Sequence, residues 1–285
     1  MPHPGHAARA QPLPQHEPPS FGGKRQMIRA GIGGWIYPPW RGSFYPAGLP
    51  QKRELEHAAR RLTTIEINGT YYRSQKPDSF ARWHDEVPED FIFALKAPRF
   101  ATNRKRLAEA GESVSRFLDS GLLRLGDKLG PINWQFLPTK AFDRQDFAAF
   151  LALLPPEHRG RQLRHAVEVR HDSFRDPAFV EMAAERGVAV VLAGDSEHPQ
   201  IADQTADFAY LRLMGTREGE PEGYPPDLLD RWAERARSLE AGRAPEGLSR
   251  LAQTGSRPCE VFLYVISGFK AANPVAAEAL IRRTS

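Results

Sequence analysis

Thr64–Asn68 reads TIEIN and Ala166–Arg170 reads AVEVR, and these two stretches decide the fold. Side chains of a strand alternate between its two faces, so each stretch has one apolar face and one polar or charged face. The stretch Tyr210–Leu213, YLRL, repeats this pattern, and Lys96 lies on one face of another apolar run. A parallel sheet covered by helices on both sides is apolar throughout, whereas a barrel can turn polar groups into its interior. The pattern therefore favours a barrel over a doubly wound open sheet.

Eight short apolar runs alternate with helical segments along the chain. Eight strand–helix units in roughly 250 residues are typical of a TIM-type (β/α)8 barrel, and the sequence predicts this α/β fold. The predicted strands are Ile28–Gly33, Thr64–Asn68, Phe91–Lys96, Pro131–Phe136, His165–Arg170, Ala189–Ala193, Phe208–Leu213 and Val261–Val265.

Helix boundary signals lie between these strands. Asp143, Asp176 and Asn273 are each placed to cap the start of a helix, and proline follows Asp176 and Asn273 at the first helical position. The link after the sixth predicted strand, Gly194–Ala206, has no helical pattern. Helices are predicted within Gln51–Leu62 and Phe147–Leu154, after Asp176 and after Asn273.

Composition places the chain among ordinary globular proteins, with 285 residues, 41% hydrophobic residues and a net charge of +4. Residues 1–26 are rich in proline and poor in apolar residues, which predicts a disordered tail, and residues 27–285 are predicted to form one barrel domain. A single cysteine, Cys259, excludes a disulfide framework. No apolar run approaches the roughly 20 residues of a membrane helix, so we expect no membrane partner.

The functional site of such a barrel lies at the carboxyl ends of its strands. Two carboxylates there, Glu66 and Glu168, are the candidate catalytic acid and base. The lysine and arginines suit an anionic group such as a phosphate. An internal salt-bridge network that merely fills the barrel is the alternative interpretation. The predicted substrate-binding residues from the strands are Asn68, Lys96, Gln135, Arg170 and Arg212.

The loops after the first three strands are rich in aromatic and basic residues. Trp35, Tyr37, Tyr72 and Arg73 are predicted to contact the substrate, because aromatic faces stack on sugars or bases. Trp40 and Phe44 are instead predicted to anchor the first loop as an apolar plug. The basic run Arg99–Arg106 could hold phosphates or could be the solvated start of a helix.

A metal site is the weaker interpretation of the acidic groups. Glu66, Glu168, His171 and Asp195 could supply ligands, yet the chain has no HxH or HExxH spacing, and His171 is placed to cap a turn. We therefore predict no metal and no cofactor, with a divalent metal as the open alternative.

Several strings together resemble the YecE-like family, domain of unknown function 72. These are GGWIYPPWRGSFYP (33–46), EINGTYYR (66–73), FALK (93–96), EVRHDSF (168–174) and YLRLMG (210–215), with the Gln135 strand between them. The resemblance implies a TIM-type barrel in a bacterial-type cytoplasmic protein, and it implies no activity. The chain departs from this family's usual residues at three places: Met214 replaces a histidine, Asn103 lies where a threonine–histidine pair is usual, and Ser267 lies where an asparagine pair is usual. A different substrate or a weakened activity is the expectation from these departures.

Three functions remain open from the sequence. The first is an enzyme that binds a phosphorylated or sugar-like anionic small molecule in a polar pocket, with Glu66 and Glu168 as acid and base. The second is a nucleic-acid-binding or processing protein that uses the aromatic and basic loops. The third is a non-catalytic ligand- or partner-binding barrel. Substrate, reaction and oligomeric state are not decided by these residues.

Overall fold

The computed structural model describes residues 27–252 and 254–285, so the predicted disordered tail, residues 1–26, lies outside the described residues. Nine strands form one parallel sheet in the order β8-β7-β4-β3-β2-β1-β11-β10-β9. The strands are β1 (Ile28–Gly33), β2 (Thr64–Ile67), β3 (Ile92–Lys96), β4 (Leu129–Gln135), β7 (His165–Glu168), β8 (Ala189–Val190), β9 (Leu192–Gly194), β10 (Phe208–Leu213) and β11 (Glu260–Val265). A short antiparallel pair, β5 (Glu157–His158) and β6 (Arg161–Gln162), precedes β7.

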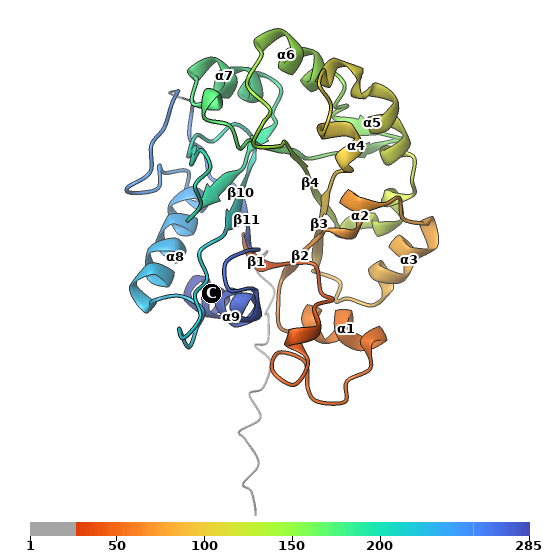
Figure 1. Cartoon of the computed structure of the whole chain (residues 1–285), viewed down its shortest axis with the longest axis vertical. Coiled ribbons are helices and arrows are strands. Elements are labelled where there is room, and N and C mark those ends of the chain that lie inside the picture. Colours follow the sequence, from red (N-terminus) through yellow and green to blue (C-terminus); the bar gives the residue numbers. More distant parts are fainter. Residues whose placement is uncertain (1–26, 253) are drawn as a thin grey trace, which may run out of the picture.

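The two edges of the sheet, β8 and β9, are separated along the chain by a single residue, Val191. Val191 donates its backbone N–H to the Val167 carbonyl of β7, while β9 pairs with β10. The sixth predicted strand, Ala189–Ala193, is therefore split into two pieces, each bound to one neighbour, and the sheet closes on itself there. The TIM-type barrel predicted from the sequence is confirmed (Figure 1).

Helices surround the barrel (Figure 1). They are α1 (Glu54–Ala59), α2 (Gly69–Tyr72), α3 (Pro77–Asp85), α4 (Arg99–Thr102), α5 (Gly111–Leu118), α6 (Arg144–Ala152), α7 (Pro177–Glu185), α8 (Pro226–Glu240) and α9 (Asn273–Thr284). Short 3-10 turns cover Pro38–Trp40, Gln51–Arg53, Leu107–Ala110, Leu122–Lys128, Asp172–Phe174 and Lys270–Ala272. No helix follows β9 before β10, as predicted.

Two of the three predicted helix caps are confirmed. The Asp143 side chain accepts the Asp146 N–H at the start of α6, and the Asp176 side chain accepts the Ala178 N–H at the start of α7. The prediction for Asn273 is wrong, because a 3-10 turn runs directly into α9 and gives Asn273 helical dihedrals. Its side-chain oxygen instead accepts a hydrogen bond from the Thr216 hydroxyl.

Alternation along the strands separates two layers, as the sequence predicted. Ile65 and Ile67 belong to the apolar layer under the helices, while Glu66, between them, is fully buried inside the barrel. β1 and β2 approach so closely that a Cβ on Gly31 would lie 1.7 Å from the Thr64 carbonyl oxygen. Trp40 and Phe44 are buried in the first loop, which confirms the predicted apolar plug.

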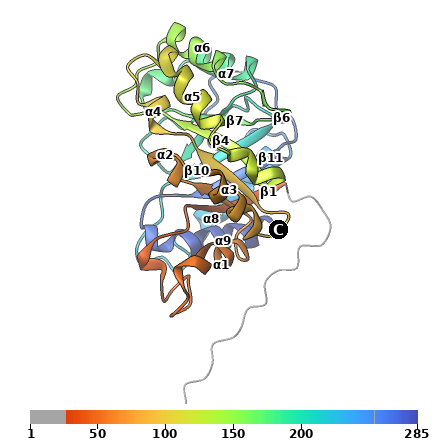
Figure 2. The same cartoon turned by 90° about the vertical axis from the view of Figure 1, so that its right-hand side faces the viewer.

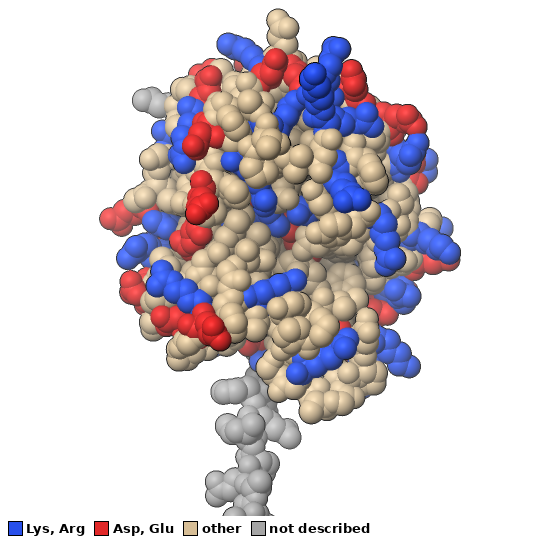
Figure 3. Space-filling model, viewed as in Figure 1, with Lys and Arg blue, Asp and Glu red and all other residues tan. Residues whose placement is uncertain are grey.

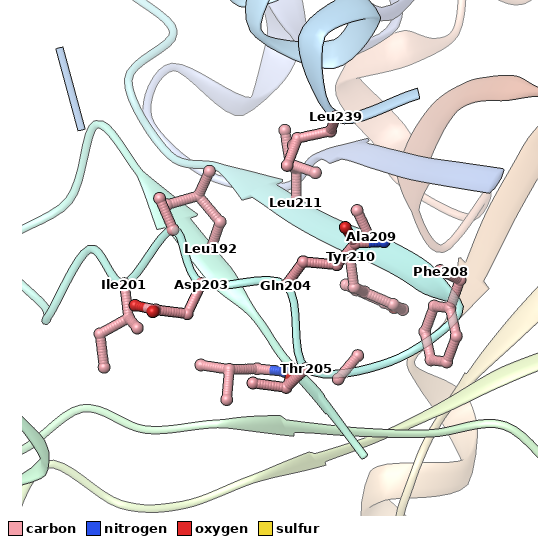
Figure 4. Close-up of a pocket in the computed structure, with 13 residues that line it drawn as sticks. Leu192, Ile201, Asp203, Gln204, Thr205, Phe208, Ala209, Tyr210, Leu211 and Leu239 are labelled. Carbon is pink, nitrogen blue, oxygen red and sulfur yellow. Dashed lines mark hydrogen bonds between the residues drawn. The ribbon is translucent and has the colours of Figure 1, made fainter. Parts of the chain in front are cut away.

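Figure 2 shows α2 and α4, which follow β2 and β3, at the end of the barrel opposite the chain's C-terminus. The carboxyl ends of the strands therefore open toward the viewer in Figure 1. The segment 201–205, which follows β9, lies beside β8, β9 and β10, and a cavity of about 20 Å³ is left between them (Figure 4). This volume holds about one water molecule, so the cavity is too small for a substrate.

Candidate functional site

Polar side chains from four strands meet inside the barrel near the carboxyl ends of those strands. We call this set the barrel cluster. Figure 3 shows basic and acidic side chains in the hollow at the centre of this face. The barrel cluster consists of Glu66 (β2), Asn133 and Gln135 (β4), Glu168 (β7), Arg170 directly after β7, and Tyr210 and Arg212 (β10). All of these side chains are buried except that of Arg170, which is 22% exposed.

Arg212 joins the two buried carboxylates. Its guanidinium lies 2.9 Å from Glu66 Oε1 and also forms an ion pair with Glu168 Oε2. Arg212 is 3% exposed and both glutamates are 0% exposed, so the three charges are shielded from bulk solvent. Charges buried this deeply are tolerated because each is paired and hydrogen-bonded.

Other side chains also donate hydrogen bonds to the oxygens of both carboxylates. Tyr210 donates its hydroxyl to Glu66 Oε2 at 2.6 Å, and Gln135 donates to Glu168 Oε2 at 2.8 Å. Arg170 donates from two nitrogens to Glu168 Oε1, at 3.0 and 2.8 Å. Every carboxylate oxygen of the pair therefore has a donor, and both side chains are held in one orientation.

Electrostatics keep Glu168 ionised. Burial alone would raise the pKa of its carboxyl, but the guanidinium groups of Arg212 and Arg170 outweigh burial and hold this pKa well below its usual range. Burial and the neighbouring Glu66 carboxylate raise the pKa of Tyr210 far above its ordinary value, so its hydroxyl remains a donor. At neutral pH Glu168 is therefore an ionised carboxylate that holds no proton to give and is a weak base.

Lys96, at the end of β3, lies beside the barrel cluster, but its ammonium is not surrounded by carboxylates as Arg212 is. Its side chain is buried, and its Nζ lies 4.2 Å from the centre of the Tyr71 ring. Among the described residues, no carboxylate comes within ion-pair distance of this ammonium. Burial and the positive charge of Arg212 lower the pKa of Lys96 to about 8, against the opposing effect of Glu66 and Glu168.

The interior charges do not balance. Lys96, Arg170 and Arg212 bring three cations to the cluster, whereas Glu66 and Glu168 bring two carboxylates. A buried cation without a paired anion is costly, and an anionic ligand would remove that cost. The arrangement thus has the charge of an anion site.

The structure brings together five of the predicted strand residues and leaves most loop residues outside the cluster. Trp35 packs against Trp83 and Phe93 in the helix-facing layer, with ring centres 5.3 and 6.4 Å apart. Tyr37 packs on Trp40, and the Lys270 ammonium lies 4.5 Å from the Tyr37 ring.

The other predicted contacts lie at the mouth of the barrel. Asn68 lies against Gly33, where a Cβ would come 2.8 Å from its amide nitrogen. Tyr72 is 62% exposed and Arg73 is exposed. Neither of these two has an ion pair or hydrogen bond with the cluster in the described part of the chain.

Three members of the site were not predicted: Asn133, Tyr210 and Tyr71. Asn133 shares a strand face with Gln135, and Tyr210 shares one with Arg212, so the alternation that identified their partners also pointed to them. Tyr71 lies in α2, one residue before the predicted Tyr72, and it faces Lys96. Neighbouring helical residues point in different directions, so the sequence did not distinguish these two tyrosines.

The acidic groups considered for a metal do not gather. Within residues 27–252 and 254–285, no three His, Cys, Asp or Glu side chains lie close enough together to hold a metal ion. His171 accepts the Ser173 N–H, which confirms its predicted role as a cap. The Asp195 carboxylate accepts a hydrogen bond from the Trp232 indole at 2.7 Å.

A family model described as "Protein of unknown function DUF72" matches residues 29–284 of the chain. The chain belongs to the DUF72 family. This confirms the resemblance read from the sequence strings, and the matched range contains the whole barrel cluster.

Curated relatives agree with this membership. UPF0759 protein YecE of Escherichia coli K12 is 30% identical over 165 residues, which is 57% of this chain and 55% of YecE. UPF0759 protein YunF of Bacillus subtilis 168 is 26% identical over 161 residues, covering 54% of this chain and 55% of YunF. The DUF72 chain thus spans about half the length of the curated relatives it matches.

Two solved DUF72 family proteins share the fold. The protein from Thermotoga maritima MSB8 has a TM-score of 0.66 and 23% identity, with 90% of this chain and 97% of that chain covered. The protein from Enterococcus faecalis V583 has a TM-score of 0.67 and 17% identity, with 90% and 94% covered. None of the helices in the described parts of this DUF72 protein has the length and apolar character needed to cross a membrane.

Proposed function

We propose that this DUF72 protein is an enzyme that binds the anionic group of a small molecule, phosphorylated or sugar-like, at the barrel cluster. The observation that carries the proposal is the surplus of buried positive charge. Lys96 has an aromatic ring beside its ammonium and no carboxylate partner within the described residues. A bound phosphate or carboxylate supplies the missing negative charge.

Arg170 is the second cation suited to such a ligand. It directs two of its nitrogens to one oxygen of Glu168 and keeps 22% of its side chain exposed. The guanidinium carries further N–H donors in a planar fork that matches phosphate and carboxylate oxygens. Arg212 lies deeper and is occupied by both glutamates, so we assign it to positioning and not to ligand contact.

The predicted acid and base, Glu66 and Glu168, remain candidates within this proposal. Glu168 stays ionised at neutral pH, because the neighbouring guanidinium groups hold its pKa well below the usual range, and it therefore has no proton to donate and is a weak base. An acid step needs a group other than Glu168. Met214, Asn103 and Ser267, where the chain departs from the family pattern, are candidates for tuning substrate choice.

Isothermal titration of the full chain with inorganic phosphate at pH 7 tests the anion site. A hydrogen bond to a charged group is worth about 1.5–3 kcal/mol, so Lys96→Met is expected to weaken phosphate binding by roughly 10- to 100-fold. Arg161→Met is the control, because it also replaces a cation by methionine. Arg161 lies in β6, outside the barrel sheet, and pairs with the exposed Asp127. Equal affinity in Lys96→Met and the wild type would contradict the proposal.

A second candidate function rests on the exposed aromatic residues of the mouth. Tyr72 in α2 and Phe100 in α4 are 62% and 60% exposed, and the Arg99 guanidinium lies 5.5 Å from the Phe100 ring centre. Exposed rings beside cations suit the bases and phosphates of single-stranded nucleic acid. Binding of a single-stranded oligonucleotide that weakens with salt and is lost in Phe100→Ala would favour this candidate.

The third candidate is a non-catalytic ligand- or partner-binding barrel, and a turnover assay distinguishes it from the proposed enzyme. Ligand binding with no turnover of any bound phosphate ester or sugar acid would favour it. The cytoplasmic location remains a prediction from the resemblance.

A further inference from the structure

Two lysines of the described chain are buried, and their ammonium groups differ in what surrounds them. Lys128 donates to the carbonyl oxygens of His84 and Val87, at 2.6 and 2.8 Å. Lys96 has the face of the Tyr71 ring at 4.2 Å and no hydrogen-bond partner among the described residues. Lys128 is thus held by hydrogen bonds, whereas the nitrogen of Lys96 is available to a ligand.

The Lys96 backbone is fixed while its side-chain nitrogen is left without a hydrogen bond. The Thr70 hydroxyl, from α2, donates to the Lys96 carbonyl oxygen at 2.7 Å, and the Ala97 N–H donates to the Asn133 carbonyl at 2.9 Å. The Cα position is therefore set by β3, β4 and α2 together. A side-chain nitrogen that is carried by a fixed backbone at the carboxyl end of a barrel strand is well placed to react with a bound substrate.

Neighbouring cations favour the neutral amine at this position. Burial removes most of the water from the Lys96 ammonium, and the positive charges of Arg212 and Arg170 add to this effect, while Glu66 and Glu168 oppose it. A lysine that is desolvated or lies beside another cation becomes a nucleophile near neutral pH, because the proton that blocks its lone pair is lost more easily. No other described lysine combines burial, two neighbouring arginines and the lack of a hydrogen-bond acceptor.

We propose that Lys96 Nζ forms an imine with a carbonyl carbon of the substrate, and that the substrate is a small aldehyde or ketone bearing a phosphate or carboxylate. This inference rests on the proposed anion site, in which Arg170 contacts the anionic group. The neutral amine adds to the carbonyl carbon, which forms a C–N bond and breaks the carbonyl π bond, and the proton that the nitrogen loses passes to the oxygen to give a carbinolamine. A second proton, from solvent, then protonates the hydroxyl, the C–O bond breaks, and water leaves a protonated imine. No oxidant or reductant takes part.

Reductive trapping tests the imine directly. The full chain is incubated with dihydroxyacetone phosphate and sodium cyanoborohydride, which reduces an imine to a stable secondary amine, and peptides are mapped by mass spectrometry. At pH 8 a lysine with a pKa of about 8 has roughly a hundredfold more neutral amine than one near 10.4. Since a weaker base is also a weaker nucleophile, we expect labelling of Lys96 about tenfold above any exposed lysine.

Two variants give the matched comparison. Lys96→Arg keeps the positive charge and removes the nucleophile, so the adduct should disappear while a thermal melt reports whether the fold is retained. Lys140→Arg is the control, because the Lys140 ammonium is ion-paired with Asp146 at 2.7 Å and its replacement should leave labelling of Lys96 unchanged.

The outcomes separate this inference from the proposed function. Labelling confined to Lys96 and suppressed by inorganic phosphate supports both. Labelling of Lys96 that phosphate does not suppress supports the imine and counts against the anion site. Labelling spread over the exposed lysines, or its absence from Lys96 while phosphate still binds, overturns the imine and leaves the anion site standing.

Discussion

Replacement of Arg212 by methionine removes the side chain that pairs with both buried carboxylates, and we expect it to destabilise the barrel strongly. Glu66 and Glu168 are fully buried, and Arg212 forms an ion pair with each. Removal of one partner from a buried ion pair costs about 3–5 kcal/mol, because the charge left behind has no water to solvate it. A typical domain has a free energy of unfolding of about 5–15 kcal/mol, so Arg212→Met consumes a large part of it.

The loss should depend on pH in a defined direction. In the wild type the pKa of Glu168 is depressed, so its stabilising contribution is present above its unfolded-state pKa, near 4.5, and is lost as the pH falls through the folded value. Without Arg212, burial instead favours the protonated carboxyls. The variant is therefore penalised most at neutral pH and less at pH 5.5.

Urea denaturation followed by circular dichroism at pH 7.5 and pH 5.5 measures both effects. Arg161→Met serves as the control, since the Asp127 partner of Arg161 is 99% exposed and little change is expected. The triple variant Arg212→Met/Glu66→Gln/Glu168→Gln should recover part of the lost stability because neither carboxylate is then left buried as an anion without Arg212. A loss below about 1 kcal/mol, or the same loss at both pH values, would refute the reasoning on buried charge.

Three further predictions concern the scaffold. Burial lowers the pKa of His165 to about 4, below its unfolded 6.5, so the wild type should lose up to about 3 kcal/mol as the pH falls from 6.5 to 4. Urea midpoints across this range should depend less on pH in His165→Gln, and an unchanged dependence would exclude His165 as the cause. Gly31→Ala should fail to yield folded protein by circular dichroism, because its Cβ would overlap the Thr64 carbonyl oxygen, whereas Gly255→Ala, with open space around it, should fold normally. Asp176→Ala should cost about 1 kcal/mol in urea melts through loss of the α7 cap, and unchanged stability would argue against that cap.

Local sequence patterns predicted the strands and the inward-facing charges well. Alternation in TIEIN and AVEVR placed Glu66 and Glu168 inside the barrel, where both are fully buried. The predictions failed where a residue's neighbours come from distant segments. Asn273 was expected to cap α9, but a 3-10 turn and the Thr216 hydroxyl determine its conformation.

The surroundings of the loop residues were not given by local sequence. Trp35, predicted to contact the substrate, packs against Trp83 and Phe93 outside the barrel cluster, and the Lys96 ammonium lies beside the Tyr71 ring and not beside a carboxylate. A loop aromatic can turn toward the core or toward the mouth with the same local sequence. The packing of helices over the sheet decides between the two.

The sequence by itself determined the alternation of strands and helices, the face on which each strand charge lies and the family to which the chain belongs. These properties depend on the two-residue period of a strand and on local motifs. Only the tertiary structure decided which cation pairs with which carboxylate. The stagger between neighbouring strands brings Arg212 to both glutamates and leaves Lys96 beside a ring. That stagger is set by closure of the whole barrel, to which every strand contributes.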